Sequence, residues 1–461
     1  MEYIAILMFF VVCLVLLCGY PVAFSLAGTA LFFAGVGTLF NSFDSDFLSA
    51  LPSRIFGVMN NQTLLAVPLF VFMGAMLERS KIAENLLNAM SILFGHLRGG
   101  LGISVTLVGM LLAASTGIVG ATVVTMGLLS LPTMLKRGYK PEFATGIICA
   151  TGTLGQIIPP SIALVLLGDV LSSAYQKAQL SMGVFNPKTV SVGDLFAGAV
   201  IPGLILVAMY MSYCVIYAVL KPANVPSLTK HDIAEIQQQQ SLFSLMLSSL
   251  LPPLLLMFVV LGSILFGFAT PTEAAGVGAM GSTLLALWQR QLTRKNLTLV
   301  MQTTVKITSM VFLILIGASL FSLVFRGFGG EELVQGFFEQ MPGGILGATL
   351  ITMLVIFLLG FILDFIEITF VVVPIVAPIL LAMGLDPIWL GIMIAINLQT
   401  SFLTPPFGFA LFYLRGVADA TIKTASIYRG VIPFIIMQLL LLLMLALWPA
   451  LITWLPETIY G

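Results

Sequence analysis

Two proline pairs interrupt long apolar runs of this chain, and they restrict its fold more than any other feature. They are Pro159-Pro160 in the first half and Pro405-Pro406 in the second. Each proline removes a backbone donor and its ring clashes with the preceding turn, so each run is expected to be a helix that breaks partway along. In lipid, a break is tolerated only where the freed backbone groups line a cavity or an ion site.

The two pairs stand in the same sequence register, which indicates an internal duplication. Pro159 follows Gly138 by 21 positions, and Pro405 follows Gly384 by the same number. Other landmarks pair at offsets that drift as loop lengths differ, as in an old repeat. The expected units are residues 1–220, a linker at 221–241, and residues 242–461. Interrupted helices at corresponding positions of two repeats indicate the central site of a secondary transporter.

The composition indicates a polytopic membrane protein. Hydrophobic residues make up 59% of the 461 and charged residues only 8%, too few to cover a water-soluble globule of this length. Apolar stretches of about 20 residues suit transmembrane helices, and the sequence lacks the alternation of an outer-membrane barrel. Positive and negative residues balance, and no basic patch suggests nucleic acid. The four cysteines lack metal-ligand spacing and are expected to be small buried hydrophobic residues.

Basic residues orient the loops. The loop at 136–140 is basic, whereas its counterpart at 383–387 has no positive charge. By the positive-inside rule the two loops lie on opposite faces, so the repeats are expected to be inverted. With both termini in the periplasm, nearly all basic residues fall on the cytoplasmic side. The basic residues left outside are Arg54, Lys177, Lys188 and Arg326.

Each copy is also expected to contain a re-entrant helical hairpin. Residues 101–135 are too long for one crossing and have short arms, and the equivalent segment is 344–382. The broken helices are expected at 143–171 and 389–413. The sequence therefore predicts an all-α polytopic membrane protein of two inverted repeats, each with a hairpin and a Pro-Pro-broken transmembrane helix. The long connection at 172–192 is expected on the periplasmic side.

Small and hydroxyl-bearing residues gather at the first hairpin tip, 113–122, and before the first break, 150–156. Glycine lets the backbone open, and released carbonyls with threonine hydroxyls make a hard-oxygen site suited to sodium. The half-helix that begins after Pro160 offers free amides and a positive dipole end to an anion. The same residues also suit close packing between small-residue helix faces.

The second hairpin carries two acids, Asp364 and Glu367, in an otherwise apolar stretch. Acids within a membrane are costly enough to count as functional by default, and at i and i+3 they share a helix face. The alternative is that they lie near the headgroups or cap a half-helix. Glu273, just after Pro271, is expected to stabilise a helix N-terminus.

Motifs in a fixed order then cover essentially the whole chain. They are Gly19–Phe24, Pro68–Phe70, Lys136–Tyr139, Gly152–Gly155, Ile158–Ser161, Ala269–Ala275, Asp386–Trp389 and Thr404–Pro406. As an ordered set they resemble the large membrane subunit, of the M or DctM type, of tripartite ATP-independent periplasmic (TRAP) transporters, within the wider ion-transporter superfamily.

The resemblance implies sodium-driven secondary uptake of an organic anion across the bacterial inner membrane. The anion would be a carboxylate such as a C4-dicarboxylate, a 2-oxo acid or a hydroxy acid, and Na⁺ would be the coupling ion. It also implies a periplasmic substrate-binding protein and a small membrane subunit of the Q type as partners. The family resembles an elevator, in which hairpins and broken helices move against a scaffold.

Carried over by position, the resemblance implies two sodium sites. The first set is Ser115, Thr116, Gly117, Gly120, Thr151, Gly152 and Thr153, and the second is Gly360, Asp364, Asn397, Gln399 and Thr400. Residues at the two breaks are candidates for the anion. They are Pro159, Pro160, Ser161, Thr404, Pro405, Pro406 and Gly408.

Other functions fit less well, with one close alternative. A sodium-coupled carboxylate symporter that works without a binding protein shares the inverted repeats and hairpins, and dependence on a binding protein separates the two. An enzyme is not expected, because the sequence has no His-Glu-x-x-His motif, paired catalytic Asp signature or nucleophile with a base. ATP is not expected as the energy source, because no P-loop is present. A passive channel does not need two inverted broken helices.

Overall fold

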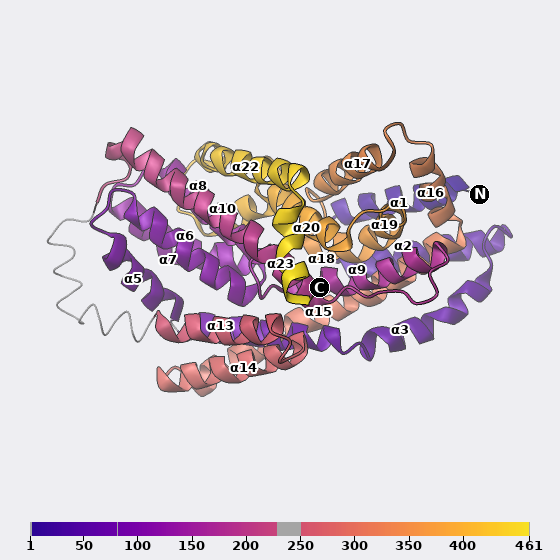
Figure 1. Ribbon diagram of the computed structural model, residues 1–461, viewed down its shortest axis with the longest axis horizontal. Helices are drawn as coiled ribbons and strands as arrows, with labels where there is room; N and C mark the ends of the chain where they lie inside the picture. The colour runs from indigo at the N-terminus through magenta and orange to yellow at the C-terminus, as the bar shows by residue number, and fades with distance from the viewer. Residues whose placement is uncertain (1, 81, 228–249, 461) are drawn as a thin grey trace.

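The computed structural model describes all residues except 1, 81, 228–249 and 461. In this part the chain is helical throughout and contains no strand (Figure 1). In the first half the helices, with short 3₁₀ helices marked η, are α1 (Glu2–Leu17), α2 (Val22–Leu39), η1 (Ser45–Ala50), α3 (Leu51–Met59), η2 (Thr63–Leu65), α4 (Ala66–Arg79), α5 (Ile82–Phe94), α6 (Gly100–Thr116), α7 (Val119–Lys136), α8 (Pro141–Thr153), η3 (Leu154–Gln156), α9 (Ile162–Ser181), α10 (Val192–Leu220) and η4 (Pro222–Asn224). In the second half they are α13 (Leu251–Leu265), α14 (Pro271–Trp288), α15 (Arg294–Gly327), α16 (Gly330–Glu339), α17 (Gly344–Leu359), α18 (Phe365–Val371), α19 (Val373–Ala382), α20 (Pro387–Leu403), α21 (Phe409–Val417), α22 (Thr424–Leu447) and α23 (Ala450–Tyr460).

Length and apolar composition make this helical chain a polytopic membrane protein. Among the described helices, α2, α7, α10, α15 and α22 are each long and apolar enough to cross a membrane. Large apolar side chains also face outward, such as Phe40 at 78% and Phe268 at 84% exposure. Such a surface is a liability in water but suits lipid or a membrane partner. The all-α polytopic fold class predicted from the sequence is confirmed, whereas the inverted repeat stays a prediction.

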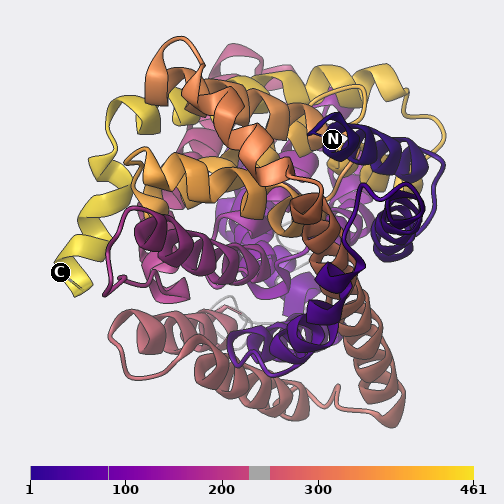
Figure 2. The same ribbon diagram turned by 90° about the vertical axis from the view of Figure 1, so that its right-hand side faces the viewer.

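Helices from the two halves of the sequence pack closely against each other. The α8 helix crosses α22, and α2 packs along α15. A Cβ on Gly146 of α8 would overlap the Gly430 carbonyl of α22, and a Cβ on Gly317 of α15 would lie 2.6 Å from the Ala23 carbonyl oxygen of α2. Glycine at these crossings brings the backbones together, as small residues do in membrane helix packing. The α13 and α14 helices lie side by side along the lower edge in both views (Figures 1 and 2), and α14 packs on α4.

A helix break lies at each proline pair. The α8 helix and the short η3 turn precede Pro159-Pro160, and α9 follows it; α20 precedes Pro405-Pro406, and α21 follows it. The part of the first broken helix that follows the break is longer than expected, because α9 continues beyond Leu171 to Ser181. Residues 172–181 contain no glycine or proline, so nothing in them stops a helix. The helix ends before Gly183, whose φ of +81° suits a helix terminus, and the connection expected at 172–192 shrinks accordingly.

The segments expected as hairpins also have defined turns. The α6 and α7 helices meet at Gly117, which has φ +62° and donates its N–H to the Ala113 carbonyl at 2.9 Å. The second segment differs from a simple two-arm hairpin, because its return arm is split into α18 and α19, which are bent by 57°. Pro374 stands in the first turn of α19, where a missing N–H is tolerated but a continuous helix from α18 is not.

Helices outside the apolar spans were not expected from the sequence. They are η1, α3, α5 and α16. Each is too short to register as a crossing. The linker expected at 221–241 falls largely outside the described residues, and its described start includes the η4 turn.

Candidate transport site

The turn between α6 and α7 lies against both arms of the first broken helix. A Cβ on Gly117 would lie 2.8 Å from the backbone nitrogen of Ile162, the first residue of α9. A Cβ on Gly155, within η3, would lie 3.0 Å from the Ala113 carbonyl oxygen. Glycine at these two positions therefore lets the turn approach the break at backbone distance.

Other residues of the first sodium set lie at contacts with α6, α7 and α21. A Cβ on Gly109 of α6 would lie 2.7 Å from the Thr151 Cβ, and one on Gly152 would overlap the Val123 side chain of α7. A Cβ on Gly120 would lie 2.8 Å from the Tyr413 ring, so this hairpin also touches α21 beyond the second break. The backbones of Ser115 and Thr116 end α6, and their side chains lie outside the described part. Thr151 and Gly152 of this set therefore pack against the two hairpin helices, and Gly120 packs against α21.

Two threonine hydroxyls of α8 use their protons within the helix. Thr151 donates to the Ile147 carbonyl and Thr153 to the Ala150 carbonyl, each at 2.8 Å. Both side chains are fully buried. Because each hydroxyl proton is used within the helix, each oxygen faces its surroundings as an acceptor. Acceptor oxygens of this kind suit a hard cation.

Gln399 joins the second break to the first. Its Nε2 donates to Thr153 Oγ1 at 3.3 Å, and both side chains are fully buried. Since Thr153 already donates its own proton, it accepts here, which orients the amide. Gln399 Oε1 is then buried without a direct hydrogen bond among the described residues, and the Tyr210 side chain lies beside Gln399. An orphaned buried oxygen costs about 1–3 kcal/mol, and a bound cation would remove that cost.

Other members of the second sodium set hold α20 against α17. Asn397 Nδ2 donates to the Met353 carbonyl at 2.7 Å, and Ser401 Oγ donates to the Phe357 carbonyl at 2.7 Å. A Cβ on Gly360 would lie 2.6 Å from Ser401 Oγ. Gly360 and Asn397 therefore lie along one helix contact, together with Ser401, which the site prediction did not include.

The side chains of Thr400 and Gln399 donate hydrogen bonds to residues outside α17, whereas that of Asn397 donates to α17. Thr400 Oγ1 donates to the Ile396 carbonyl at 2.8 Å within α20, and Gln399 turns toward Thr153. The second set is thus spread around α20, with one face on α17 and another on α8. In the structure it is less compact than the first set.

The two intramembrane acids form a helix cap. Asp364 is the N-cap of α18, and its carboxylate accepts the Phe365 N–H at 2.7 Å. Glu367 Oε2 accepts the Asp364 N–H at 3.0 Å. This reciprocal pairing satisfies N–H groups that a helix start leaves open, as the capping alternative expects. A role of the two acids in transport stays a prediction. Glu273 caps α14 in the same way with Thr270, as expected.

The candidate anion residues divide into a closed and an open half. Pro159, Pro160 and Ser161 are buried, and Ser161 Oγ donates to the Gly155 carbonyl at 2.7 Å. That hydroxyl proton is therefore not offered to an anion in this conformation. Around the second break, Pro406 is exposed and Thr404 and Pro405 are half-buried, whereas Gly408 is buried.

The chemistry of these candidates is that of oxygen ligands. In the described part of the chain, no group of three or more His, Cys, Asp or Glu side chains could hold a metal ion. Hydroxyl, amide and backbone oxygens suit a hard cation rather than a transition metal. Helix breaks lined by such oxygens, in an apolar multi-pass chain, are features of a membrane transporter.

Comparison with known proteins identifies the family. Residues 7–451 match the family model described as "Tripartite ATP-independent periplasmic transporter, DctM component". The chain therefore belongs to the DctM family of TRAP transporters. It is a transporter permease subunit and not an enzyme, and membership implies a small membrane subunit and a periplasmic binding protein as partners.

Curated relatives match over nearly their full lengths. The chain is 30% identical to the C4-dicarboxylate TRAP transporter large permease protein DctM of Pseudomonas aeruginosa, covering 90% of this chain and 91% of that protein. It is 30% identical to the sialic acid TRAP transporter large permease protein SiaM of Vibrio cholerae, covering 97% of each. It is 28% identical to the ectoine TRAP transporter large permease protein TeaC of Halomonas elongata, covering 94% of each.

Solved structures share the fold at low sequence identity. The Alcanivorax borkumensis YdaH transporter superposes with a TM-score of 0.58 at 14% identity, covering 90% of each chain. Neisseria gonorrhoeae MtrF gives a TM-score of 0.57 at 13% identity, covering 87% of this chain and 83% of that one. These similarities concern the fold alone.

Proposed function

We propose that this chain is the large permease of a sodium-coupled TRAP importer that takes up an organic acid across the bacterial inner membrane. The observation that carries the proposal is the buried contact between Thr153 and Gln399. It joins one residue from each candidate sodium set, on helices that end at the two breaks. An orphaned oxygen beside that contact is what a hard cation would satisfy.

In this proposal sodium and the anion are coupled through the helix breaks. Sodium bound to oxygens near Thr151, Thr153 and the Gly117 turn would hold that turn against the start of α9. An anion that binds only this geometry then binds more tightly when sodium is present, and by linkage sodium binds more tightly when the anion is present. The moving part would consist of the helices of the two hairpins and two breaks, arranged as inverted repeats with both termini in the periplasm.

The proposed substrate is a carboxylate, such as a C4-dicarboxylate, a 2-oxo acid or a hydroxy acid. Relatives of similar identity are named for C4-dicarboxylates, sialic acid and ectoine. The substrate is therefore a choice that differs within the family, and the periplasmic binding protein is proposed to make it.

Uptake into proteoliposomes tests this function. The chain and its small subunit would be reconstituted, and uptake of labelled succinate, 2-oxoglutarate and lactate measured with and without the cognate binding protein and an inward sodium gradient. Uptake that needs both supports the proposal. Uptake without the binding protein would favour a stand-alone carboxylate symporter, and uptake that ignores sodium would exclude coupling.

A further inference from the structure

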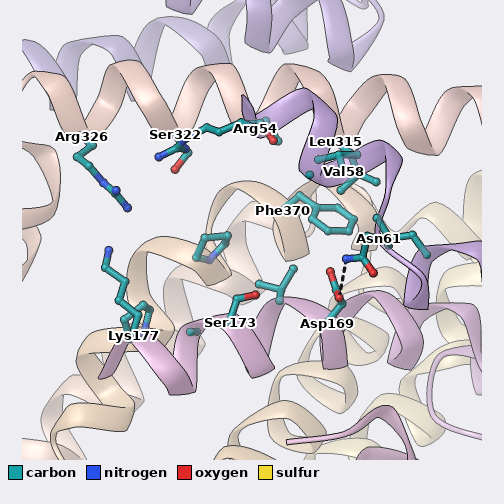
Figure 3. A pocket seen from close by; sticks show the side chains of 18 of the residues that line it. Arg54, Val58, Asn61, Asp169, Ser173, Lys177, Leu315, Ser322, Arg326 and Phe370 are labelled. Carbon is teal, nitrogen blue, oxygen red and sulfur yellow. Dashed lines mark hydrogen bonds between the residues drawn. The ribbon is translucent and has the colours of Figure 1, made fainter. Parts of the chain in front are cut away.

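A charged cavity of about 400 Å³ lies apart from the helix breaks. Its walls come from α3, α9, α15, α16, α18 and α19, and Figure 3 shows side chains that α3, α9, α15 and α18 contribute. The volume is within the range of small-molecule sites. Three basic residues line it: Arg54, Lys177 and Arg326. All three are among the few basic residues that the topology predicted from the sequence places on the periplasmic side.

Acidic residues neutralise only part of this positive charge. Glu331 accepts from Lys177 Nζ at 2.7 Å and from an Arg326 terminal nitrogen at 3.0 Å. At the far end of the cavity Asp169 accepts from Asn61 Nδ2 at 2.9 Å (Figure 3). Among the described residues that line the cavity, three cationic side chains thus stand against two carboxylates, an excess of one positive charge.

Two guanidinium groups keep donors without an acceptor. Arg326 Nε is buried and has no hydrogen-bond partner among the described residues. In the same described part, Arg54 forms no ion pair and donates no hydrogen bond, although it interacts electrostatically with Arg326 and Glu331. Buried donors are normally satisfied, and a planar guanidinium matches a carboxylate with two parallel hydrogen bonds.

We propose that this cavity is a binding site for the carboxylate of an organic anion on the periplasmic side, with Arg54 and Arg326 as its ligands. The inference rests on the proposed function and adds to it a subsite separate from the two helix breaks. Ser322, which also lines the cavity, offers a hydroxyl beside the cationic end. A carboxylate that displaces Glu331 from Lys177 would release the ion pair that joins α9 to α16.

Thiol labelling tests the cavity without relying on transport. Ser322→Cys would be introduced into a Cys13→Ser/Cys18→Ser background, because Cys18 is exposed and Cys13 is partly buried, whereas Cys149 and Cys214 are buried. Labelling rates would be compared for two methanethiosulfonates of similar size, one bearing a sulfonate and one a trimethylammonium group. We expect the sulfonate reagent to react faster, and millimolar succinate, but not choline, to slow it.

Charge variants show whether Arg54 is responsible. Arg54→Gln is expected to lower the ratio of sulfonate to trimethylammonium rates about tenfold, because loss of one positive charge slows the sulfonate reagent and speeds the trimethylammonium reagent by about threefold each. Arg54→Lys keeps the charge and is expected to retain the ratio. Lys188→Gln removes an exposed basic residue from outside the cavity and is expected to leave the ratio unchanged.

The outcomes separate this inference from the proposed function. An unchanged ratio in Arg54→Gln, or labelling that succinate does not slow, would overturn the carboxylate site even if uptake is sodium-dependent. Charge selectivity and succinate protection that both depend on Arg54 support the site even if uptake proves independent of sodium, which would refute only the coupling. If Arg54→Gln fails to fold, the same comparison with Arg326→Gln decides.

Discussion

The buried hydrogen bond between Gln399 and Thr153 predicts a strong effect for a nearly shape-preserving substitution. Thr153→Val replaces the hydroxyl with a methyl group and leaves Gln399 Nε2 without its acceptor. Because both side chains are fully buried, the orphaned donor keeps its desolvation cost of about 1–3 kcal/mol. Thr153→Ser keeps the hydroxyl and loses only one methyl group, so it is the matched control.

A double-mutant cycle measures that interaction directly. Thermal unfolding of the purified protein would be compared for wild type, Thr153→Val, Gln399→Leu and the double variant. Contacting residues couple by about 0.5–3 kcal/mol, so Thr153→Val is expected to cost less in the Gln399→Leu background than alone. Equal costs in both backgrounds would show that the two side chains do not interact and would refute the link between the breaks.

The same variants test the sodium assignment. Thr153→Val removes a proposed oxygen ligand, and we expect apparent sodium affinity in uptake to fall about tenfold, equivalent to about 1.4 kcal/mol. Thr153→Ser is expected to retain most of the affinity. Thr153→Ala and Asp364→Ala are also expected to lower it while the protein still folds. Normal sodium dependence in both alanine variants would exclude these residues from the sodium sites.

Three further predictions concern stability. In Gly430→Ala the new Cβ would overlap a backbone carbonyl of α8, and we expect a loss of about 1–3 kcal/mol in stability, seen as a lower unfolding temperature. In the control Gly276→Ala the new Cβ meets nothing within 4 Å, so little effect is expected. Thr270→Ala removes the α14 capping box and is expected to cost about 0.5–2 kcal/mol, with Thr270→Asp as the retained cap. Burial raises the pKa of Glu331, but its two cationic partners, Lys177 and Arg326, outweigh this and hold the pKa below its ordinary 4.5. The ion pairs therefore stabilise the fold fully above pH 4.5, and this stabilisation is lost as the pH falls through the lowered pKa. The difference in unfolding temperature between wild type and Glu331→Gln should accordingly shrink in acid.

Local backbone chemistry explains what the sequence predicted well. A proline beyond the first turn of a helix removes a backbone donor and clashes with the preceding turn, so the pairs at Pro159 and Pro405 predicted interruptions from the local sequence alone. The Asp364–Glu367 spacing also carries a local signal, since an acid three residues after an N-cap is a capping box. The hydrogen bonds of α18 show this capping box, while the cost of acids within a membrane keeps a transport role for the pair as a prediction.

The charged cavity could not be predicted because no local pattern encodes it. Arg54, Lys177 and Arg326 lie far apart in the sequence, and the positive-inside rule sorts them only to the same side of the membrane. Two of the walls, α3 and α16, are short helices that an apolar-length criterion does not find. A local sequence signal for α16 is its pair of acids, Glu331 and Glu332, in the first turn.

The two breaks occupy different environments although they stand in the same sequence register. Pro159 and Pro160 are buried, whereas Pro406 is exposed and Phe407 is 54% exposed. A carrier that opens alternately to the two sides of the membrane needs one break to be exposed and the other buried in one conformation, and the reverse in the next. In the proposed mechanism α9 moves with the first break, so the Lys177–Glu331 pair that joins it to α16 has to separate. An anion that competes with Glu331 for Lys177 would lower the cost of that separation, so arrival of the substrate would itself favour the movement that carries it.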